Sequence, residues 1–324
     1  MATIEILGIE HSYELTGFAS SSPTLVFIHG WLLSRGYWQP LIERLAADYQ
    51  CLAYDLRGFG QSLTSLAPEI VETKLPNNSL SIAPDYQPSS LSATAQTTSP
   101  PVASSNSQQN SCNCYTAAAY ANDLVILLER LNISSAWLIG HSLGATVALW
   151  AADGRSAQIK GVVCINAGGG IYLKEAFEQF RAAGQQLVKI RPRWLCYLPL
   201  IDLIFTRANV VNPIARQWGR QRLIDFVMAH PDAALGTLLD LTTEEEVNRL
   251  PPLVSQLSQP VYFFAGQQDR IMEPKYVRHL ASFHPLFQSQ EGNVLEISNC
   301  GHLAMLEQTD TVAIEIRSIL ARHN

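Results

Sequence analysis

Short apolar runs alternate with longer amphipathic segments along most of this chain, and no other feature restricts its fold as strongly. Strands that alternate with helices predict a mostly parallel, doubly wound α/β sheet with helices on both faces. Residues before Pro23 are expected to add one or two antiparallel edge strands. The runs that we expect as strands buried on both faces are Thr24–Ile28, Cys51–Tyr54, Ala136–Ile139, Gly161–Ile165, Val261–Phe264 and Val294–Ile297. The helical patterns are Trp38–Ala47, Ala117–Leu131, Leu143–Ala152, Pro274–Phe283 and Leu303–Leu320.

Two segments interrupt this alternation. Residues 64–111 are rich in Ser, Thr, Gln, Asn and Pro and carry almost no charge after Lys74, which predicts a disordered surface insertion. Residues 168–256 have helical periodicity without a convincing strand and are too long for a simple crossover. We therefore expect a helical cap at 168–256, inserted into an α/β core made of residues 1–167 and 257–324.

The expected cap is both basic and apolar. Residues 174–222 hold nine Lys or Arg against three acids, a local charge of +6 in a chain whose net charge is −6, and they include the apolar run Trp194–Ile201. Such a surface can make peripheral contact with an anionic membrane or with a lipophilic substrate. The interpretation that we favour is a cap that packs its apolar face inward and leaves its arginines in solvent.

Charge and composition exclude several other classes. The acidic net charge gives no sign of nucleic-acid binding. Residues 1–17 lack the basic start and apolar core of a secretory signal, and no apolar run approaches the roughly 18 residues that span a bilayer. The six cysteines are scattered and form no paired CxxC metal pattern. We expect a cytoplasmic protein, and the sequence implies neither a metal nor an organic cofactor.

The motif that carries chemistry is Gly140-His141-Ser142-Leu143-Gly144, a full match to G-x-S-x-G. It follows the expected strand Ala136–Ile139 and opens the expected helix Leu143–Ala152. A sharp strand-to-helix turn needs small residues beside the central serine, and it lifts the serine hydroxyl above the sheet edge. This context favours a nucleophilic serine over a plain Gly/Ser turn.

With this motif the chain resembles the α/β-hydrolase superfamily, and in particular its capped serine hydrolases of the lipase and esterase branch. Three further motifs agree with the resemblance: His29-Gly30-Trp31 after the first parallel strand, Asp55-Leu56-Arg57-Gly58-Phe59-Gly60-Gln61-Ser62 after the next, and Asn299-Cys300-Gly301-His302 near the C-terminus. The resemblance implies that the first motif is the oxyanion loop, with the backbone N–H groups of Trp31 and Leu143 as donors. It also implies structural roles for Asp55 and Arg57.

A serine hydroxyl needs a base to remove its proton. Of the eight histidines, His302 is best placed, between the last expected strand and the last helix. His29 and His141 belong to motifs, where hydrogen bonding and loop shaping are the expected roles. The other five are interpreted as ordinary surface residues: His11, His230, His279, His284 and His323.

The base in turn needs an acid that fixes its tautomer. Asp269 follows the strand Val261–Phe264 at its carboxyl end, the edge where open α/β sheets place their sites. The order Ser142, Asp269, His302 is the order that the superfamily requires. Glu273 is the main competitor, and a simple surface role for Asp269 is the other alternative.

The resemblance and the three residues predict a serine hydrolase that cleaves a small, lipophilic carboxylic ester through an acyl-enzyme on Ser142. A serine at this position argues against the dehalogenase and epoxide-hydrolase chemistries of related enzymes. The same triad could serve carbon–carbon bond hydrolysis, perhydrolase chemistry or acyl transfer. A ligand-binding protein without catalysis, built on the same scaffold, is the alternative from another class.

Overall fold

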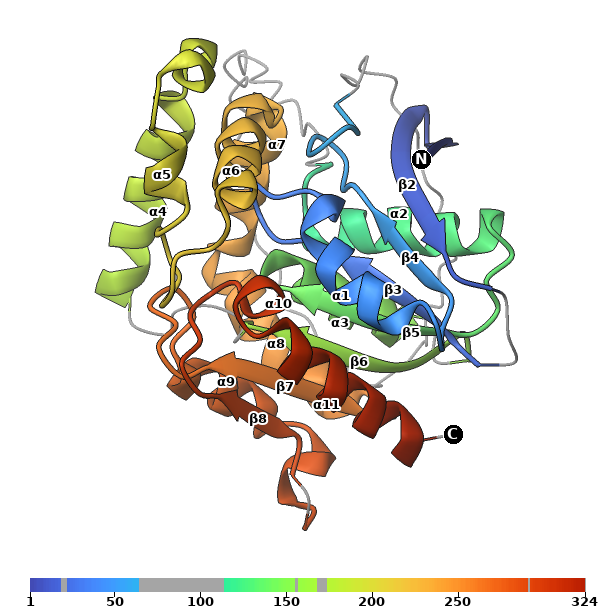
Figure 1. The fold of residues 1–324 in the computed structure, drawn as a ribbon. Coiled ribbons are helices and arrows are strands. Elements are labelled where there is room, and N and C mark those ends of the chain that lie inside the picture. The colour runs from blue at the N-terminus through green and yellow to red at the C-terminus, as the bar shows by residue number, and fades with distance from the viewer. Residues whose placement is uncertain (19–21, 64–113, 155–156, 168–173, 291, 324) are drawn as a thin grey trace, which may run out of the picture. The chain divides into compact units, whose positions relative to one another are not determined.

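A computed structural model describes residues 1–18, 22–63, 114–154, 157–167, 174–290 and 292–323 of the 324-residue chain. Its centre is an eight-stranded sheet of order β1-β2-β4-β3-β5-β6-β7-β8 (Figure 1). β1 and β2 are antiparallel, and the strands from β4 to β8 pair in parallel, so the predicted sheet with antiparallel edge strands is confirmed. The strands are β1 Ala2–Ile6, β2 Ile9–Thr16, β3 Thr24–Ile28, β4 Cys51–Tyr54, β5 Ala136–His141, β6 Ile159–Ile165, β7 Val261–Gly266 and β8 Val294–Ile297.

Helices cover both faces of this sheet because successive side chains of its central strands point to opposite faces. Val26 and Ile28 of β3 pack with α2 and α3 on one face, whereas Leu25 and Phe27 pack with α1 and α11 on the other. The helices of these layers are η1 Arg35–Trp38, α1 Gln39–Leu45, α2 Ala117–Arg130, α3 Leu143–Gly154, α9 Pro274–Ala281, η3 Pro285–Gln288, α10 Ala304–Glu307 and α11 Thr309–Arg322.

Two details of the sheet and its last helix differ from the sequence prediction. β8 is not buried on both faces, because it is the last strand of the sheet and three of its four residues are partly exposed. The helix expected at residues 303–320 is interrupted at Gln308, whose φ of −135° and ψ of 44° are not helical, so α10 and α11 are separate.

In residues 174–256, the inserted helical segment between β6 and β7, all the regular elements are helices. In Figure 1, α6 and α7 lie between the sheet and the outer pair α4 and α5. The cap was predicted at 168–256, and its first residues, 168–173, lie outside the described residues. The insertion predicted at 64–111 lies wholly outside them. The helices are α4 Lys174–Lys189, η2 Arg193–Tyr197, α5 Asp202–Phe205, α6 Arg216–Met228, α7 Pro231–Leu241 and α8 Glu244–Gln256.

The apolar run Trp194–Ile201 packs inward only in part, through Leu195, Cys196 and Ile201, whereas the favoured interpretation expected its apolar face to be covered. Trp194, Tyr197, Leu198 and Leu200 are exposed, because η2 and the turn after it contact α6 with only part of their surface. Within the described residues, no helix combines the length and the apolar character that crossing a bilayer requires.

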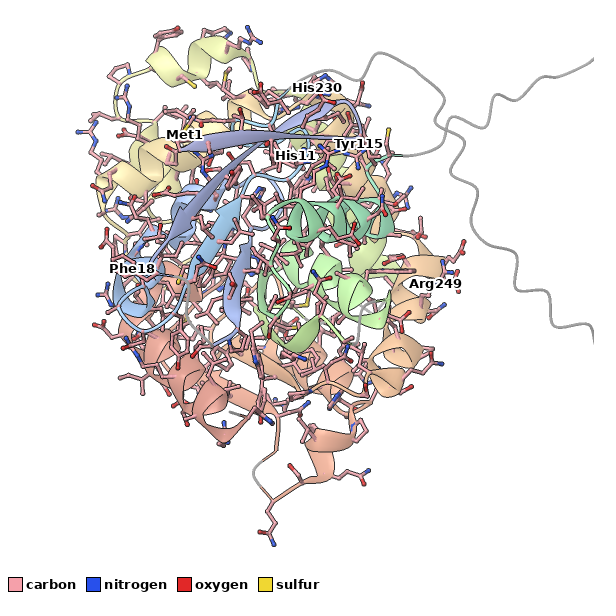
Figure 2. All side chains as sticks on the ribbon, turned by 90° about the vertical axis from the view of Figure 1, so that its right-hand side faces the viewer. Met1, His11, Phe18, Tyr115, His230 and Arg249 are labelled. Carbon is pink, nitrogen blue, oxygen red and sulfur yellow. The ribbon has the colours of Figure 1, made fainter. Side chains whose placement is uncertain are left out.

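Two of the histidines interpreted as surface residues are buried, so that interpretation is wrong for them. His11 lies among other side chains where β2 passes α2 (Figure 2), with its Nε2 3.5 Å from a carboxylate oxygen of Asp123. His284 caps η3, accepting from the Leu286 N–H, and its Nε2 bonds to the Gln259 carbonyl. Both nitrogens of the His284 ring thus have protein partners in place of water, whereas His11 has one at Nδ1, the Ile9 carbonyl at 3.1 Å.

Candidate active site

Ser142 stands on a sharp turn between β5 and α3. Its φ of 52° lies in the left-handed region, which residues other than glycine rarely adopt. The two glycines of the motif have no room for a side chain. A Cβ on Gly144 would lie 2.1 Å from the Ile28 carbonyl oxygen, and one on Gly140 would lie 2.3 Å from that of Gly144. The spacing of G-x-S-x-G therefore follows from the close approach of three backbone segments.

We expect Gly144→Ala to lower the free energy of unfolding by about 1–3 kcal/mol, the usual cost of overpacking. The added methyl group would meet backbone atoms of β3, which cannot rotate away. Gly154 at the other end of α3 is the matched control, because no atom lies within 4 Å of its Cβ position. Urea denaturation of both variants measures the difference. Equal loss in the two variants would contradict the packing argument.

His302 and Asp269 form a buried, hydrogen-bonded pair. The distance from His302 Nδ1 to Asp269 Oδ2 is 2.7 Å, and Asp269 is 3% exposed. The backbone N–H groups of Ile271 and Met272 donate to Asp269 Oδ1 over 2.8 and 3.0 Å. Burial opposes ionisation of this carboxyl, but the His302 charge and these hydrogen bonds outweigh it and hold the pKa of Asp269 below its ordinary value.

Glu273, the competitor for this role, lies elsewhere. It is exposed, precedes α9 as its N-cap residue, and places a carboxylate oxygen 2.9 Å from Lys275 Nζ. The turn after β7 therefore points Asp269 and not Glu273 toward His302.

Asn166 was missed by sequence analysis and holds the Asp269 side chain in place. This fully buried residue follows β6 with a φ of 51°, and its Nδ2 donates to Asp269 Oδ2 over 2.8 Å and to the Gly301 carbonyl over 3.0 Å. One amide thus joins the Asp269 turn to the loop that carries His302. Its signal was an asparagine directly after a strand, because asparagine tolerates the left-handed region better than most residues.

Glu307 of α10 holds the His302 loop from the other side. Its carboxylate accepts hydrogen bonds from the backbone N–H groups of Gly301, Leu303 and Val211. The His302 N–H itself donates to the Asn209 carbonyl over 2.8 Å. Asn209 and Val211 belong to the inserted helical segment, so this loop is fastened to the segment at two points. No local sequence pattern predicts these contacts, because they join residues that are far apart in the chain.

The two motif histidines are neutral hydrogen-bonding residues. His141 donates from Nε2 to the His302 carbonyl over 2.7 Å, and burial, with the nearby charge of His302, lowers its pKa to about 3. His29 donates from Nδ1 to the Gly30 carbonyl and accepts the Leu56 N–H at Nε2, and burial lowers its pKa as well. The His141 ring links the serine turn to the His302 loop, and the His29 ring links the loop after β3 to the loop after β4.

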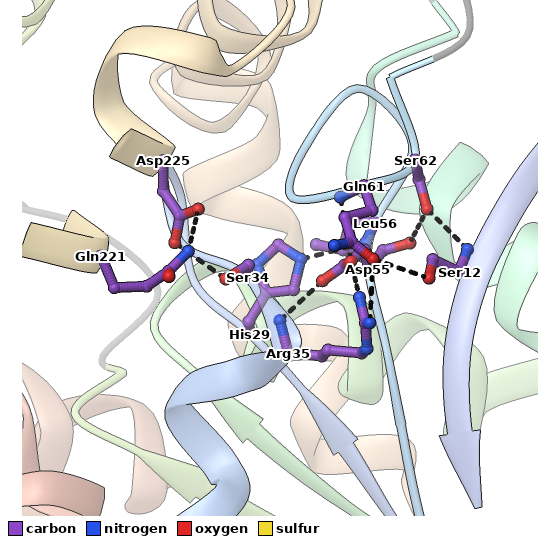
Figure 3. A network of polar contacts seen from close by, with 10 residues as sticks. All are labelled: Ser12, His29, Ser34, Arg35, Asp55, Leu56, Gln61, Ser62, Gln221 and Asp225. Atoms are coloured by element: carbon purple, nitrogen blue, oxygen red, sulfur yellow. Dashed lines mark hydrogen bonds and ion pairs between the residues drawn. The ribbon is translucent and has the colours of Figure 1, made fainter. Parts of the chain in front are cut away.

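Asp55 and Arg57 act within the scaffold. Asp55 accepts from the backbone N–H groups of Arg35 and Gln61 and pairs with the Arg35 guanidinium (Figure 3). Arg57 pairs with Asp123 of α2 over 2.6 Å. Asp55 and Arg57 are thus engaged by groups of the scaffold.

One cavity brings the predicted residues together. It has a volume of about 280 Å³, and Ser142, His302, Trp31 and Leu143 all line it. The Trp31 ring is held by a hydrogen bond from Nε1 to the Ala234 carbonyl of α7. Most of the remaining wall is apolar and comes from the core and from the inserted helical segment, including Leu33, Leu187, Leu238, Leu241, Leu250 and Met272.

The charged groups of this wall already have protein partners. Arg222 donates to the carbonyls of Phe205 and Ala208, and burial lowers its pKa. Glu246 accepts a hydrogen bond from Trp150 Nε1 over 2.7 Å, and burial raises its pKa. The cavity therefore offers apolar surface with few unengaged charges.

A family model now decides the relationship that the motifs suggested. The model of the Alpha/beta hydrolase family matches residues 25–315. The chain belongs to this family. The prediction of a hydrolase with this fold is thereby confirmed.

Curated relatives and solved structures agree with the family. Over 308 residues the chain is 25% identical to the pimeloyl-[acyl-carrier protein] methyl ester esterase of Xanthomonas axonopodis pv. citri (strain 306), covering 92% of this chain and 95% of that protein. A stretch of 55 residues is 42% identical to the protein of that name from Xylella fastidiosa (strain 9a5c), covering 17% of this chain and 20% of that protein.

Two solved structures show the same fold. An esterase from Thermogutta terrifontis superposes with a TM-score of 0.63 at 23% identity. The match covers 99% of the present chain and 97% of the esterase chain. An esterase from Exiguobacterium antarcticum superposes with a TM-score of 0.68 at 14% identity, covering 98% of each chain.

Asp225 of α6 connects the inserted helical segment of this hydrolase to the loop after β3. Its carboxylate accepts hydrogen bonds of 2.8 Å from the Ser34 hydroxyl and from Gln221 Nε2 (Figure 3). Burial raises the pKa of Asp225 to about 6, the charge of Asp55 adds to the rise, and the two hydrogen bonds oppose it. The same loop carries Trp31 and Leu33, which line the cavity.

The raised pKa of Asp225 predicts a pH-dependent stability. The folded state holds this proton more tightly than the unfolded state, whose pKa is near 3.8. The stabilisation that the Asp225 proton gives the folded state is complete below pH 3.8 and is lost as the pH rises through about 6. We expect the unfolding free energy of the native protein, minus that of Asp225→Asn, to fall over this window by at most about 1.4 kcal/mol per pH unit. Urea denaturation at several pH values measures it.

The exposed Asp153 provides the control for this measurement, because Asp153→Asn removes a carboxyl that has solvent around it. A difference between the native protein and Asp225→Asn that stays constant across the window would show that Asp225 does not titrate with folding.

Proposed function

We propose that this hydrolase cleaves carboxylic esters through an acyl-enzyme on Ser142, with His302 as general base and Asp269 as the acid that orients it. One observation carries the proposal. A serine held at positive φ lines the same cavity as a histidine whose Nδ1 is bonded to a buried, ionised aspartate. This combination matches the requirements of nucleophilic catalysis by serine.

In the proposed reaction, His302 takes the hydroxyl proton of Ser142 at Nε2, the ring nitrogen opposite Asp269. Asp269 keeps the other proton at Nδ1 and stabilises the imidazolium that forms. The serine oxygen adds to the ester carbonyl, and the imidazolium then protonates the departing alcohol. Water, deprotonated by His302, releases the acid and restores Ser142.

The negative oxygen of the tetrahedral intermediate needs fixed donors. We propose the backbone N–H groups of Trp31 and Leu143, one from the loop after β3 and one from the first turn of α3. The first N–H groups of a helix have no partner within the helix. One such donor is worth about 3–4 kcal/mol of transition-state stabilisation.

The substrate that fits this proposal is a neutral ester with a lipophilic acyl or alcohol group. The wall is mostly apolar, and its Arg222 and Glu246 are engaged by the protein. The curated relatives are named for a methyl ester of an acyl group on a carrier protein, which belongs to this class. A cytoplasmic setting remains part of the proposal.

A fluorophosphonate probe and a series of p-nitrophenyl esters test the proposal together. We expect the probe to label Ser142, identified by peptide mapping, and hydrolysis to improve with acyl length until the cavity is filled. An unlabelled Ser142 would favour a ligand-binding protein without catalysis. Labelling without hydrolysis of any ester would direct attention to carbon–carbon cleavage, perhydrolase chemistry or acyl transfer with the same triad.

A further inference from the structure

Exposed apolar side chains gather on one part of the inserted helical segment. Of the fifteen large apolar side chains that are exposed in the described residues, seven lie between residues 187 and 204. Tyr197 is 86% exposed, Ile190 68% and Ile204 65%. Scattered exposed apolar residues are normal, but such a concentration marks an interaction surface. We define the outer patch by these seven residues: Leu187, Ile190, Trp194, Tyr197, Leu198, Leu200 and Ile204.

The outer patch is surrounded by positive charge. Residues 187–222 contain seven Lys or Arg and one acid, Asp202, which is buried and paired with Arg216. Lys189, Arg193, Arg207 and Arg220 are exposed, and none of them forms an ion pair with a described residue. Residues 187–222 therefore carry a net positive charge, whereas the net charge of the whole chain is negative.

We propose that the outer patch docks the protein on an anionic lipid bilayer. Each Lys or Arg close to such a surface adds attraction, and exposed aliphatic side chains gain by entering the boundary between headgroups and acyl chains. Trp194 and Tyr197 have the amphipathic rings that are enriched at that depth. A second copy of the chain is a poorer occupant, because a two-fold interface would place like charges against each other.

Docking in this orientation would bring the bilayer to the cavity. Leu187 belongs to the outer patch, is 48% exposed and also lines the cavity that holds Ser142. A lipophilic ester could then pass from the membrane into the cavity along apolar surface. This last step depends on the proposed function, whereas docking itself does not.

Co-sedimentation with vesicles tests the proposal. We expect the full chain to bind vesicles of phosphatidylcholine mixed with phosphatidylglycerol, to bind pure phosphatidylcholine weakly, and to be released by salt, which screens the attraction. Arg193→Gln with Arg207→Gln should weaken binding about fivefold for each lost charge. Trp194→Ser with Tyr197→Ser should weaken it by at least about tenfold.

Lys160→Gln and Ile314→Ser are the matched controls, since they change an exposed cation and a 62% exposed aliphatic residue outside the outer patch. They should leave vesicle binding unchanged, and all four variants should keep hydrolysis of a short, soluble ester. Ser142→Ala should bind vesicles like the native protein, which separates docking from catalysis.

Three outcomes would overturn the proposal: no binding of the native protein to anionic vesicles, equal loss in patch and control variants, or binding that does not depend on salt. Patch variants that change the oligomeric state in sedimentation velocity, without a change in vesicle binding, would assign the surface to a second copy instead. Capture of an acidic protein, again with unchanged vesicle binding, would assign it to a protein partner.

Discussion

Ser142→Ala should lower kcat for ester hydrolysis by about a millionfold, because loss of the nucleophile removes the acyl-enzyme route altogether. Alanine keeps the Cβ atom of serine, so the backbone at a φ of 52° is no more strained in the variant than in the native protein. The fold should therefore persist while activity disappears. Steady-state kinetics on a p-nitrophenyl ester and circular dichroism measure the two properties separately.

Ser255 serves as the control serine. It is exposed, and its hydroxyl donates only to the Pro252 carbonyl. Ser255→Ala should retain full activity and full labelling by the fluorophosphonate. If Ser142→Ala kept activity within tenfold of the native protein, another residue would have to be the nucleophile.

Asp269→Asn should lower kcat by about ten-thousandfold, the effect expected when the histidine is held in the wrong tautomer. The N–H groups of Ile271 and Met272 both donate to Oδ1, so the amide oxygen of the variant must take that position. The amide NH₂ then takes the place of Oδ2, where it faces His302 Nδ1 and the Asn166 amide. His302 would have to carry its proton on Nε2 and could not accept one from Ser142.

Glu273→Gln is the control for this variant, because Glu273 was the competing acid and lies exposed against Lys275. It should leave kcat unchanged. A large loss in Glu273→Gln with a small loss in Asp269→Asn would reverse the assignment of the acid. Measurement of kcat and KM separately shows whether the loss lies in the chemical step, as we expect, or in binding.

The fold and the serine turn could be predicted from the sequence because both depend on patterns among residues that are close together in the chain. β5, Ser142 and α3 occupy one continuous stretch, and the two motif glycines are required by contacts that any sequence with this turn must make. The sequence favoured Asp269 as the acid and left Glu273 as its main competitor. The choice depends on which carboxylate the turn after β7 directs toward a loop that follows another strand.

The rest depends on packing between distant segments. Asn166 and Glu307 act through backbone groups of other elements, and side-chain patterns do not record which carbonyl or N–H will lie nearby. The buried position of His11 depends on Asp123 of α2. The exposure of Tyr197 contradicts part of our favoured interpretation, because an apolar run shows only that a surface is apolar and not what covers it.

The two contacts between the His302 loop and the inserted helical segment limit how modular this enzyme can be. Exchange of residues 174–256 for the corresponding segment of another family member would remove the Asn209 carbonyl and the Val211 N–H. The loop would then lose the partner of the His302 N–H and one of the groups that hold Glu307. The same segment therefore supplies part of the cavity wall and part of the support for His302. An active chimera must restore both contacts with the residues of the new segment.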